Sequence, residues 1–317
     1  MNYGNLGRTG LQVSDICLGT MQFLWTTDES NSYAVLDAFA AAGGNFIDSA
    51  DVYSRWAAGR KGGEAETVIG NWMQRTGNRA DLVLATKVRG RMWDGPNGEG
   101  LSRAHILRAV EGSLRRLQTD YIDLYQSHSP DANTPIEETL RAYDDLVHQG
   151  KVRYVGCSNY NGYQLMEAVL KARQAGLNEY ISIQPHYSLV ERQNFEKNTA
   201  PVVRQFGLGV IPYSPLGRGF LTGKYRRGQP LPASQRASNV QQLLTDKNFN
   251  LLDKLEALGK DRNATPAQMA LAWLLTKENV SSVIIGANTT EQLADSLGAT
   301  GLRLTADEMT ALDSLSD

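Results

Sequence analysis

Residues 45–53 read NFIDSADVY, an apolar pair followed at once by an acid and, five residues later, by a phenol. Phe46 and Ile47 are typical of the end of a buried strand, so Asp48 and Tyr53 stand at and beyond that end. What these two side chains do therefore depends on how the strand is placed in the fold. We expect Asp51, which lies between them, to cap the turn or to be solvated.

A short apolar run followed by a helical segment recurs from near residue 16 to near residue 297, which is typical of repeated β-α units. Eight strands is the number that closes a barrel, so we predict one (β/α)8 TIM barrel domain over residues 1–317. The predicted strands are Ile16–Leu18, Asn45–Ile47, Leu82–Thr86, Ile122–Tyr125, Val152–Gly156, Ile181–Ile183, Val210–Pro212 and Val283–Ile285.

Local signals support the elements around these strands. Ser102 and Pro135 each precede a stretch with apolar residues at helical spacing, and the second stretch ends at Gly150. Residues 3–13, YGNLGRTGLQV, predict a β-hairpin that plugs the bottom of the barrel. The long connections at residues 88–101 and 217–239 leave the carboxyl ends of strands, where barrel active sites lie.

Composition narrows the class of function. The 32 Lys and Arg nearly balance the 34 Asp and Glu, which gives no electrostatic reason to expect a nucleic acid or a membrane as partner. The two cysteines, Cys17 and Cys157, suggest neither a disulfide framework nor a metal site. The start of the chain shows no targeting segment, and the longest apolar run, Met269–Leu275, is too short to span a membrane. We predict a cytoplasmic protein that acts on a small molecule.

Four ionisable side chains are predicted at one mouth of the barrel: Asp48, Tyr53, Lys87 and His128. Each alone has an ordinary structural explanation, but together they favour a site, because buried Asp48 and Lys87 each supply the other's countercharge. We expect Lys87 to lower the pKa of the Tyr53 phenol and make it a general acid. His128 would orient a carbonyl oxygen or assist the proton transfer. With no nucleophile beside a base, the second reactant is predicted to be a bound hydride donor.

A dinucleotide needs a site for its pyrophosphate. The glycine pattern of dinucleotide-binding folds is absent, and residues 217–224, GRGFLTGK, do not form a P-loop motif. This stretch does offer backbone access at Gly217 and Gly219 and a cation at Lys224, directly after the seventh strand. A phosphate site and a flexible loop with incidental glycines both remain open here.

Seven motifs then occur in order: FIDSADVY, LATK, LYQSH, VGCSNY, IQPHYS, YSPLGRGFLTGKY and IIGANTTEQLADSL. In register along a (β/α)8 pattern, and over essentially the whole chain, they resemble the aldo-keto reductases. The resemblance implies a barrel that binds NADPH across its mouth and reduces aldehydes or ketones, with Asp48, Tyr53, Lys87 and His128 as catalytic residues and Tyr53 as proton donor. The implied cofactor residues are Ser158, Asn159 and Gln184 at the carboxamide, Tyr213 stacked on the ring, and Ser214, Leu216, Gly217 and Lys224 at the pyrophosphate.

The segment after the eighth strand departs from the family pattern. Family members often place Lys or Arg there to bind the 2′-phosphate, whereas this chain has Gly286, Asn288 and Gln292, with Asp295 and Ser296 at the expected adenine position. Fewer charge-assisted bonds weaken discrimination, so we predict NADPH binding with modest selectivity over NADH. Cys157, beside the nicotinamide shelf, is expected to be a packing group.

Four large side chains are candidates for the wall of the substrate pocket: Trp25, Trp56, Met92 and Trp93. The sequence does not indicate which carbonyl compound binds there, and it carries no signal of the oligomeric state. Two other functions remain open. GLSRAHI and PDANTPIEET are similar to stretches of the potassium-channel β subunits, which suggests a redox-sensing regulatory subunit. A Schiff-base enzyme that uses Lys87 is the second.

Overall fold

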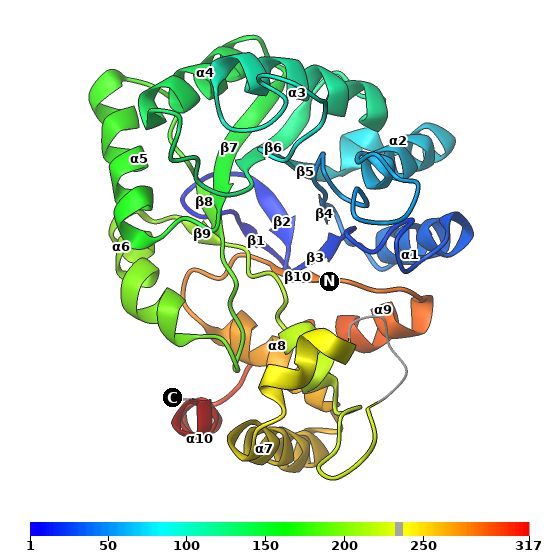
Figure 1. The fold of residues 1–317 in the computed structure, drawn as a ribbon. Helices are drawn as coiled ribbons and strands as arrows, with labels where there is room; N and C mark the ends of the chain where they lie inside the picture. Colours follow the sequence, from blue (N-terminus) through cyan, green and yellow to red (C-terminus); the bar gives the residue numbers. More distant parts are fainter. Residues whose placement is uncertain (232–236, 317) are drawn as a thin grey trace.

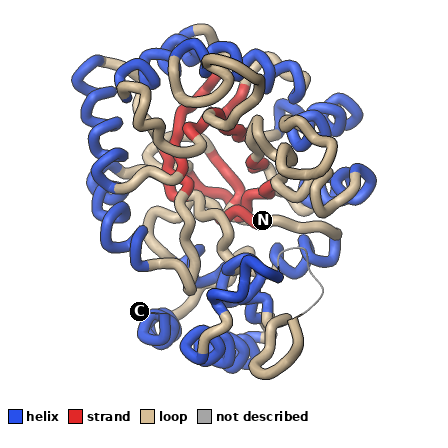
Figure 2. Tube along the Cα trace, viewed as in Figure 1, coloured by secondary structure: helices blue, strands red, loops and turns tan. Residues whose placement is uncertain are grey.

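The computed structural model of the chain describes residues 1–231 and 237–316. Strands gather at the centre and helices surround them (Figures 1 and 2). The strands are β1 (Tyr3–Asn5), β2 (Gln12–Ser14), β3 (Ile16–Gly19), β4 (Phe46–Asp48), β5 (Val83–Val88), β6 (Ile122–Ser127), β7 (Val152–Ser158), β8 (Ser182–Gln184), β9 (Gly209–Val210) and β10 (Val283–Ile285).

The helices follow the strands along the chain. The α-helices are α1 (Glu29–Ala41), α2 (Glu64–Thr76), α3 (Arg103–Leu117), α4 (Ile136–His148), α5 (Gly162–Ala175), α6 (Ala200–Phe206), α7 (Asp246–Arg262), α8 (Pro266–Thr276), α9 (Thr290–Leu297) and α10 (Ala306–Ser316). The shorter elements are η1 (Arg79–Asp81), η2 (Phe195–Thr199), η3 (Gly217–Thr222) and η4 (Ala237–Leu243). None of the described helices is long and apolar enough to cross a membrane.

The eight central strands form one parallel sheet that curls into a barrel. Their order is β10-β3-β4-β5-β6-β7-β8-β9, so every strand from β3 to β9 neighbours the next along the chain. The first and last strands of this order meet, because the Ile284 N–H donates to the Pro212 carbonyl at 3.0 Å and the Ser281 N–H to the Val210 carbonyl at 3.0 Å. The predicted (β/α)8 barrel is confirmed, and with it all eight strands.

Local chemistry explains where the helices begin. The Ser102 hydroxyl accepts the His105 N–H at the start of α3, as the sequence predicts. At α5, Asn161 and Gln164 form a reciprocal capping box. Pro135 stands just before α4, where its missing N–H costs nothing.

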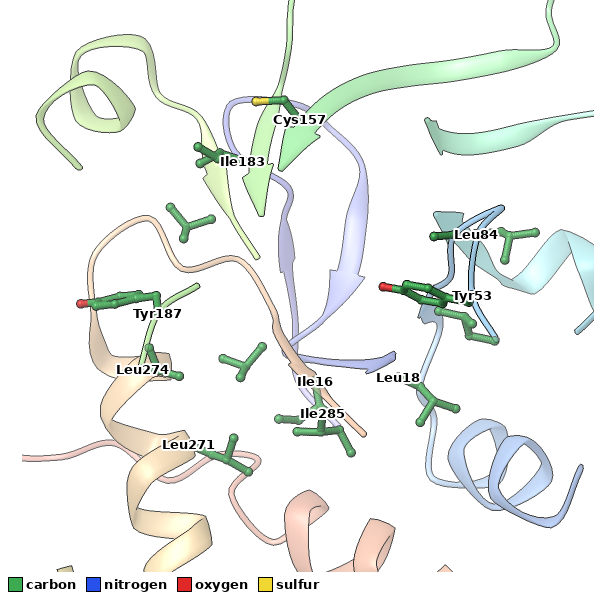
Figure 3. Close-up of a cluster of buried hydrophobic side chains, with 14 of the residues drawn as sticks. Ile16, Leu18, Tyr53, Leu84, Cys157, Ile183, Tyr187, Leu271, Leu274 and Ile285 are labelled. Carbon is green, nitrogen blue, oxygen red and sulfur yellow. The ribbon is translucent and has the colours of Figure 1, made fainter. Parts of the chain in front are cut away.

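Alternation along the strands gives the barrel two apolar clusters. The inner cluster fills the barrel and includes Cys17, Phe46, Ala85 and Leu124. The outer cluster lies between the strands and the helices. Figure 3 shows some of its residues, which come from the strands and from the helices around them. These include Ile16, Leu18, Leu84, Ile183 and Ile285 from strands and Leu271 and Leu274 from α8. Because side chains alternate along a strand, the residue two positions after each inner residue again faces inward.

The hairpin of β1 and β2 closes the amino-terminal end of the barrel. The two strands pair antiparallel, and Leu6 and Val13 are fully buried in the inner cluster. Gly7 packs so closely that an added Cβ would lie 2.5 Å from the backbone nitrogen of Gly209. The predicted hairpin and its role as a plug are both confirmed.

Two long connections leave the opposite end. Residues 89–102 join β5 to α3, and the connection after β9 holds η3 and η4. Residues 232–236 of the second connection lie outside the described residues. These loops therefore border the carboxyl ends of the strands, where the predicted site residues converge.

Candidate active site

The inward positions of β4, β5 and β6 change from apolar to polar at their carboxyl ends. Phe46 is followed two residues later by Asp48, Ala85 by Lys87, and Leu124 by Gln126. The strand period therefore aims an acid, an amine and an amide into one space above the inner cluster. Exposure is 2% for Asp48 and 0% for both Lys87 and Gln126.

The Lys87 ammonium is the centre of this site. Its Nζ donates to Asp48 Oδ2 at 2.5 Å, to the Ser49 carbonyl at 2.8 Å and to the Tyr53 hydroxyl at 2.9 Å. These three acceptors use all three of its N–H bonds. The predicted Asp48–Lys87 ion pair is present, and the Tyr53 hydroxyl contacts its ammonium.

A second set of bonds holds Asp48. Its Oδ1 accepts one amide N–H from Gln126 and one from Gln184, each at 3.0 Å. Sequence reasoning missed Gln126, although its place between Leu124 and His128 in the two-residue period marks it as inward-facing. It also assigned Gln184 only to the cofactor, whereas its described contacts include Asp48.

Burial sets the protonation state of Tyr53. Burial raises the pKa of its phenol and Lys87 opposes this, but the pKa remains above its ordinary value. Lys87 thus lowers the pKa of Tyr53 in the expected direction, but the net pKa is not lowered, because loss of solvent outweighs the neighbouring cation. Burial lowers the pKa of Lys87, whereas Asp48 and Tyr53 raise it. Their combined effect is larger than that of burial, so the pKa of Lys87 lies above its ordinary value. At neutral pH the site holds a neutral phenol against an ammonium.

His128 lies just beyond β6, beside Tyr53. The two rings are edge-on, with centroids 5.9 Å apart. Burial, followed by the charges of Lys87 and Arg89, lowers the pKa of His128 to about 3. A neutral imidazole donates one hydrogen bond but holds no additional proton to transfer.

A chain of buried hydroxyl groups supports this strand end from behind. The Ser127 hydroxyl is 2.9 Å from the hydroxyls of Tyr143 and Tyr180, and Tyr180 is 3.4 Å from Tyr160. Ser127 directly precedes His128, and Tyr160 directly follows Asn159. These hydroxyl contacts therefore hold the ends of β6 and β7 in place relative to each other.

The predicted nicotinamide shelf is assembled at the next strand ends. The Ser158 hydroxyl donates to the Gln184 carbonyl at 2.7 Å, and the Asn159 amide donates to the His128 carbonyl at 2.9 Å. The Tyr213 hydroxyl donates to Asn159 Oδ1 at 2.8 Å. The Tyr213 ring is stacked on His186, at 5.2 Å between centroids and 10° between planes. His186 had no role in the sequence prediction.

The loop after β9 has an unusual backbone. Ser214, Gly217, Arg218 and Gly219 all have left-handed φ angles, between 54° and 94°. The Gly217 N–H donates to the Ser214 carbonyl and the Gly219 N–H to the Leu216 carbonyl, each at 3.0 Å. The Lys224 ammonium lies over Gly219, at 3.4 Å from the position of an added Cβ. Lys224 therefore lies beside this backbone, which also includes Arg218, a residue that the sequence prediction omitted. Phosphate binding by this loop stays a prediction.

The segment after β10 is held by contacts within the chain. Asn288 Oδ1 accepts the hydroxyls of Thr26 at 2.9 Å and Thr27 at 2.7 Å, and the Asn288 N–H donates to Gln292 Oε1 at 2.9 Å. Asp295 accepts the Thr265 hydroxyl, and the Ser296 hydroxyl donates to the Gln292 carbonyl. An added Cβ on Gly286 would lie 1.9 Å from Gln22 Nε2. These predicted adenosine contacts thus also fasten the β10 loop to the loop after β3.

The four predicted substrate residues separate into two groups. Trp56 lies edge-on to Trp25 at 5.5 Å and to Tyr53 at 6.1 Å between ring centroids. Trp93 instead packs on α3, with its ring 4.7 Å from that of His105 and the Arg108 guanidinium 4.1 Å above it. With Met92 it lines a separate cavity of about 230 Å³. Of the four, Trp56 therefore lies beside Tyr53, and Trp25 lies beside Trp56.

Two further expectations concern buried groups. Asp51 is fully buried, with neither carboxyl oxygen hydrogen-bonded within the described chain, so the expectation that it is solvated or caps the turn is wrong. Cys157 is fully buried in the outer cluster and burial raises the pKa of its thiol, which confirms it as a packing group. A cavity of about 420 Å³ lies at the hairpin end and contains none of the site residues.

Comparisons with known proteins agree with this geometry. The profile of the Aldo/keto reductase family matches residues 15–317. An uncharacterized oxidoreductase of Bacillus subtilis, YrpG, is 40% identical over 309 residues, which cover 96% of this chain and 92% of that protein. Probable voltage-gated potassium channel β subunits of Oryza sativa and Arabidopsis thaliana are 38% and 36% identical over 313 residues, 94% of this chain and 91% of each. The chain therefore belongs to the aldo/keto reductase family and is an NAD(P)H-dependent oxidoreductase.

Proposed function

We propose that the protein reduces an aldehyde or a ketone to the alcohol, with Tyr53 as the proton donor. The observation that carries this proposal is the Lys87 ammonium, which holds both the Asp48 carboxylate and the Tyr53 hydroxyl. A neutral phenol beside a fixed cation can release its proton without leaving an isolated buried charge. Reduction of a carbonyl group to an alcohol requires such a proton donor at the carbonyl oxygen.

The proton transfer follows from the contacts of Tyr53. When bound, the reduced nicotinamide supplies a hydride to the carbonyl carbon, and the carbonyl oxygen takes the two electrons of its π bond. Tyr53 gives its proton to that oxygen, and the phenolate that remains faces the Lys87 ammonium at 2.9 Å. Asp48 keeps Lys87 oriented but accepts no proton in the step. His128, as a neutral imidazole, donates a hydrogen bond to the same oxygen.

The cofactor residues are proposed from the shelf and the loop after β9. Ser158 and Asn159 would hold the carboxamide, Tyr213 would stack on the nicotinamide ring, and the backbone around Gly217 with Lys224 would bind the pyrophosphate. Residues 286–296 contain no Lys or Arg. We therefore propose NADPH as the preferred cofactor with modest selectivity over NADH, measured as the ratio of kcat/KM for the two. A clear preference for NADH would contradict it.

The substrate side is proposed from the aromatic pair beside Tyr53. Trp56 is 47% exposed and Trp25 packs against it, so a carbonyl compound reaching Tyr53 would contact an aromatic surface. The partner is accordingly a small molecule. The two described cysteines are buried free thiols, which is compatible with a reducing compartment such as the cytoplasm.

The test is a panel of aldehydes and ketones assayed by NADPH absorbance with wild type and Tyr53→Phe. Loss of the general acid should lower kcat by about 10²–10⁴-fold, while the Kd of the cofactor stays within about threefold because the shelf is intact. Tyr163→Phe, at a tyrosine that is 68% exposed on α5, is the matched control. Full activity of Tyr53→Phe on the best substrate would show that another group donates the proton.

A regulatory function is the second candidate, and it is favoured by the two relatives named as potassium channel β subunits. In that case the barrel would bind its cofactor tightly and act through an associated protein. Stable cofactor retention without turnover on the whole carbonyl panel would support this function. The Schiff-base alternative is disfavoured, because Lys87 is an ammonium with three acceptors and imine formation needs a free amine. Absence of a borohydride-trapped adduct on Lys87 is the expected result.

A further inference from the structure

Asp51 is an ionisable residue that the proposed mechanism does not use. It lies two residues before Tyr53 and is 0% exposed. Its backbone N–H donates to the Lys87 carbonyl at 3.2 Å, but neither carboxyl oxygen has a hydrogen-bond partner in the described chain. A buried carboxylate without a partner is costly, so the state of this group needs an explanation.

Polar groups lie near Asp51, but none of those described hydrogen-bonds to its carboxyl oxygens. Glu66 on α2 is also 0% exposed, and it accepts the Thr86 hydroxyl at 2.6 Å and the Arg116 guanidinium at 2.7 Å. The Tyr125 hydroxyl is buried and has no hydrogen-bond partner in the described chain. Among the described residues, the charges that act on Asp51 therefore include a second buried carboxyl group, that of Glu66, and the Arg116 guanidinium, which already binds Glu66.

We propose that Asp51 is a positioning residue for Tyr53, buried as the uncharged carboxylic acid so that the turn carrying Tyr53 stays packed against β5. This inference deepens the proposed function and rests on Tyr53 being the proton donor. A second charge next to Glu66 would be expelled toward solvent and would take residues 51–53 with it. Neutral Asp51 can remain in place and keep its backbone bond to Lys87.

The electrostatic surroundings of Asp51 support the uncharged state. Burial raises the pKa of its carboxyl group well above the usual value, and Glu66 raises it further. Arg116 on α3, the adjacent Val52 backbone N–H and Lys87 on β5 oppose this but do not prevent it, and the Val52 N–H does not reach hydrogen-bonding geometry. Tyr125 on β6 and Tyr143 on α4 also face Asp51, and both are neutral phenols whose pKa burial raises.

Other contacts show why the turn depends on this position. The Ser54 hydroxyl donates to the Phe23 carbonyl at 2.6 Å, and the Gly63 N–H to the Tyr53 carbonyl at 3.3 Å. These bonds fix the far side of Tyr53, while Asp51 fixes the side toward Lys87. A displacement of about 1 Å can cost on the order of 100-fold in rate, so both sides matter to proton donation.

The first test compares unfolding of wild type and Asp51→Asn from pH 5 to pH 8. Folded Asp51 keeps its proton where the unfolded residue, with a pKa of about 3.9, has lost it, so wild-type stability falls as pH rises. Asparagine has a similar shape and cannot ionise. The unfolding equilibrium constant of wild type relative to the variant should therefore rise up to about tenfold per pH unit. Asp120→Asn, at an exposed aspartate, should show no such trend.

The second test measures kcat. Asp51→Asn should keep kcat within about threefold of wild type, whereas Asp51→Ala should lose about tenfold or more with the cofactor KM unchanged. A stability difference that is flat with pH, or an equal loss of kcat in Asn and Ala variants, would overturn the inference. If wild type reduces no carbonyl compound, the proposed function fails, but the unfolding comparison still decides the charge state of Asp51.

Discussion

Lys87→Met should destabilise the fold as well as abolish activity. The substitution keeps an unbranched side chain and removes the ammonium, which leaves Asp48 buried at 2% exposure without a cation. Removing one partner of a buried pair costs about 3–5 kcal/mol. Asp48 retains the amide N–H groups of Gln126 and Gln184, so we expect the lower end, about 3 kcal/mol.

This free energy translates into a melting temperature. Globular proteins gain about 2.1 cal/mol/K per residue on unfolding, or about 0.7 kcal/mol/K for a chain of this length. The Tm of Lys87→Met should then fall by about 4–5 °C in calorimetry or fluorescence-monitored unfolding. The double variant Lys87→Met/Asp48→Asn, which removes the orphaned charge, should recover part of this loss.

The control is Lys151→Met, which breaks the half-exposed ion pair with Glu111. Exposed pairs contribute about 0–1 kcal/mol, so its Tm should change by no more than about 1–2 °C. Equal losses at Lys87 and Lys151, or a double variant no more stable than Lys87→Met, would refute the assignment of Lys87 as the structural countercharge of Asp48.

Two further predictions concern His128 and Asn288. Because the pKa of His128 is lowered to about 3, kcat/KM should show no acidic limb near pH 6.5, whereas folded stability should fall as pH drops from about 6.5 toward 3. A limb near pH 6.5 that His128→Gln removes would contradict this. Asn288→Ala should raise the KM of the carbonyl substrate as well as that of the cofactor, because it frees the Thr26 and Thr27 hydroxyls beside Trp25. An unchanged substrate KM in this variant would contradict the coupling.

The barrel and its ion pair could be predicted because they depend on periodic positions. The two-residue period of β4 and β5 puts Asp48 and Lys87 on the inner face of adjacent strands, so their meeting follows once the strands are recognised. The same period includes Gln126, and only attention to the inward register of β6 would have found it.

The features that the sequence did not predict depend on loops and on contacts with helices, and no periodic pattern in the sequence marks these contacts. Trp93 follows a strand, as Tyr53 and His128 do, but packs on Arg108 of α3. The burial of Asp51 depends on α2 and α3, which bring Glu66 and Arg116 behind the turn. The pKa of Tyr53 likewise depends on how much solvent the surrounding loops exclude, which side-chain identity alone does not give.

The hydrogen bonds around Asp48 also suggest which residues relatives of this chain would retain. Asp48 joins β4 to β5 through Lys87, to β6 through Gln126 and to β8 through Gln184. In a relative that does not reduce carbonyl compounds, loss of either the Asp or the Lys would still leave the other charge buried without a partner, which gives both residues a structural reason to persist. If Tyr53 and His128 act as proposed, the identity of those two positions would separate relatives that reduce carbonyl compounds from relatives that keep the barrel for another purpose.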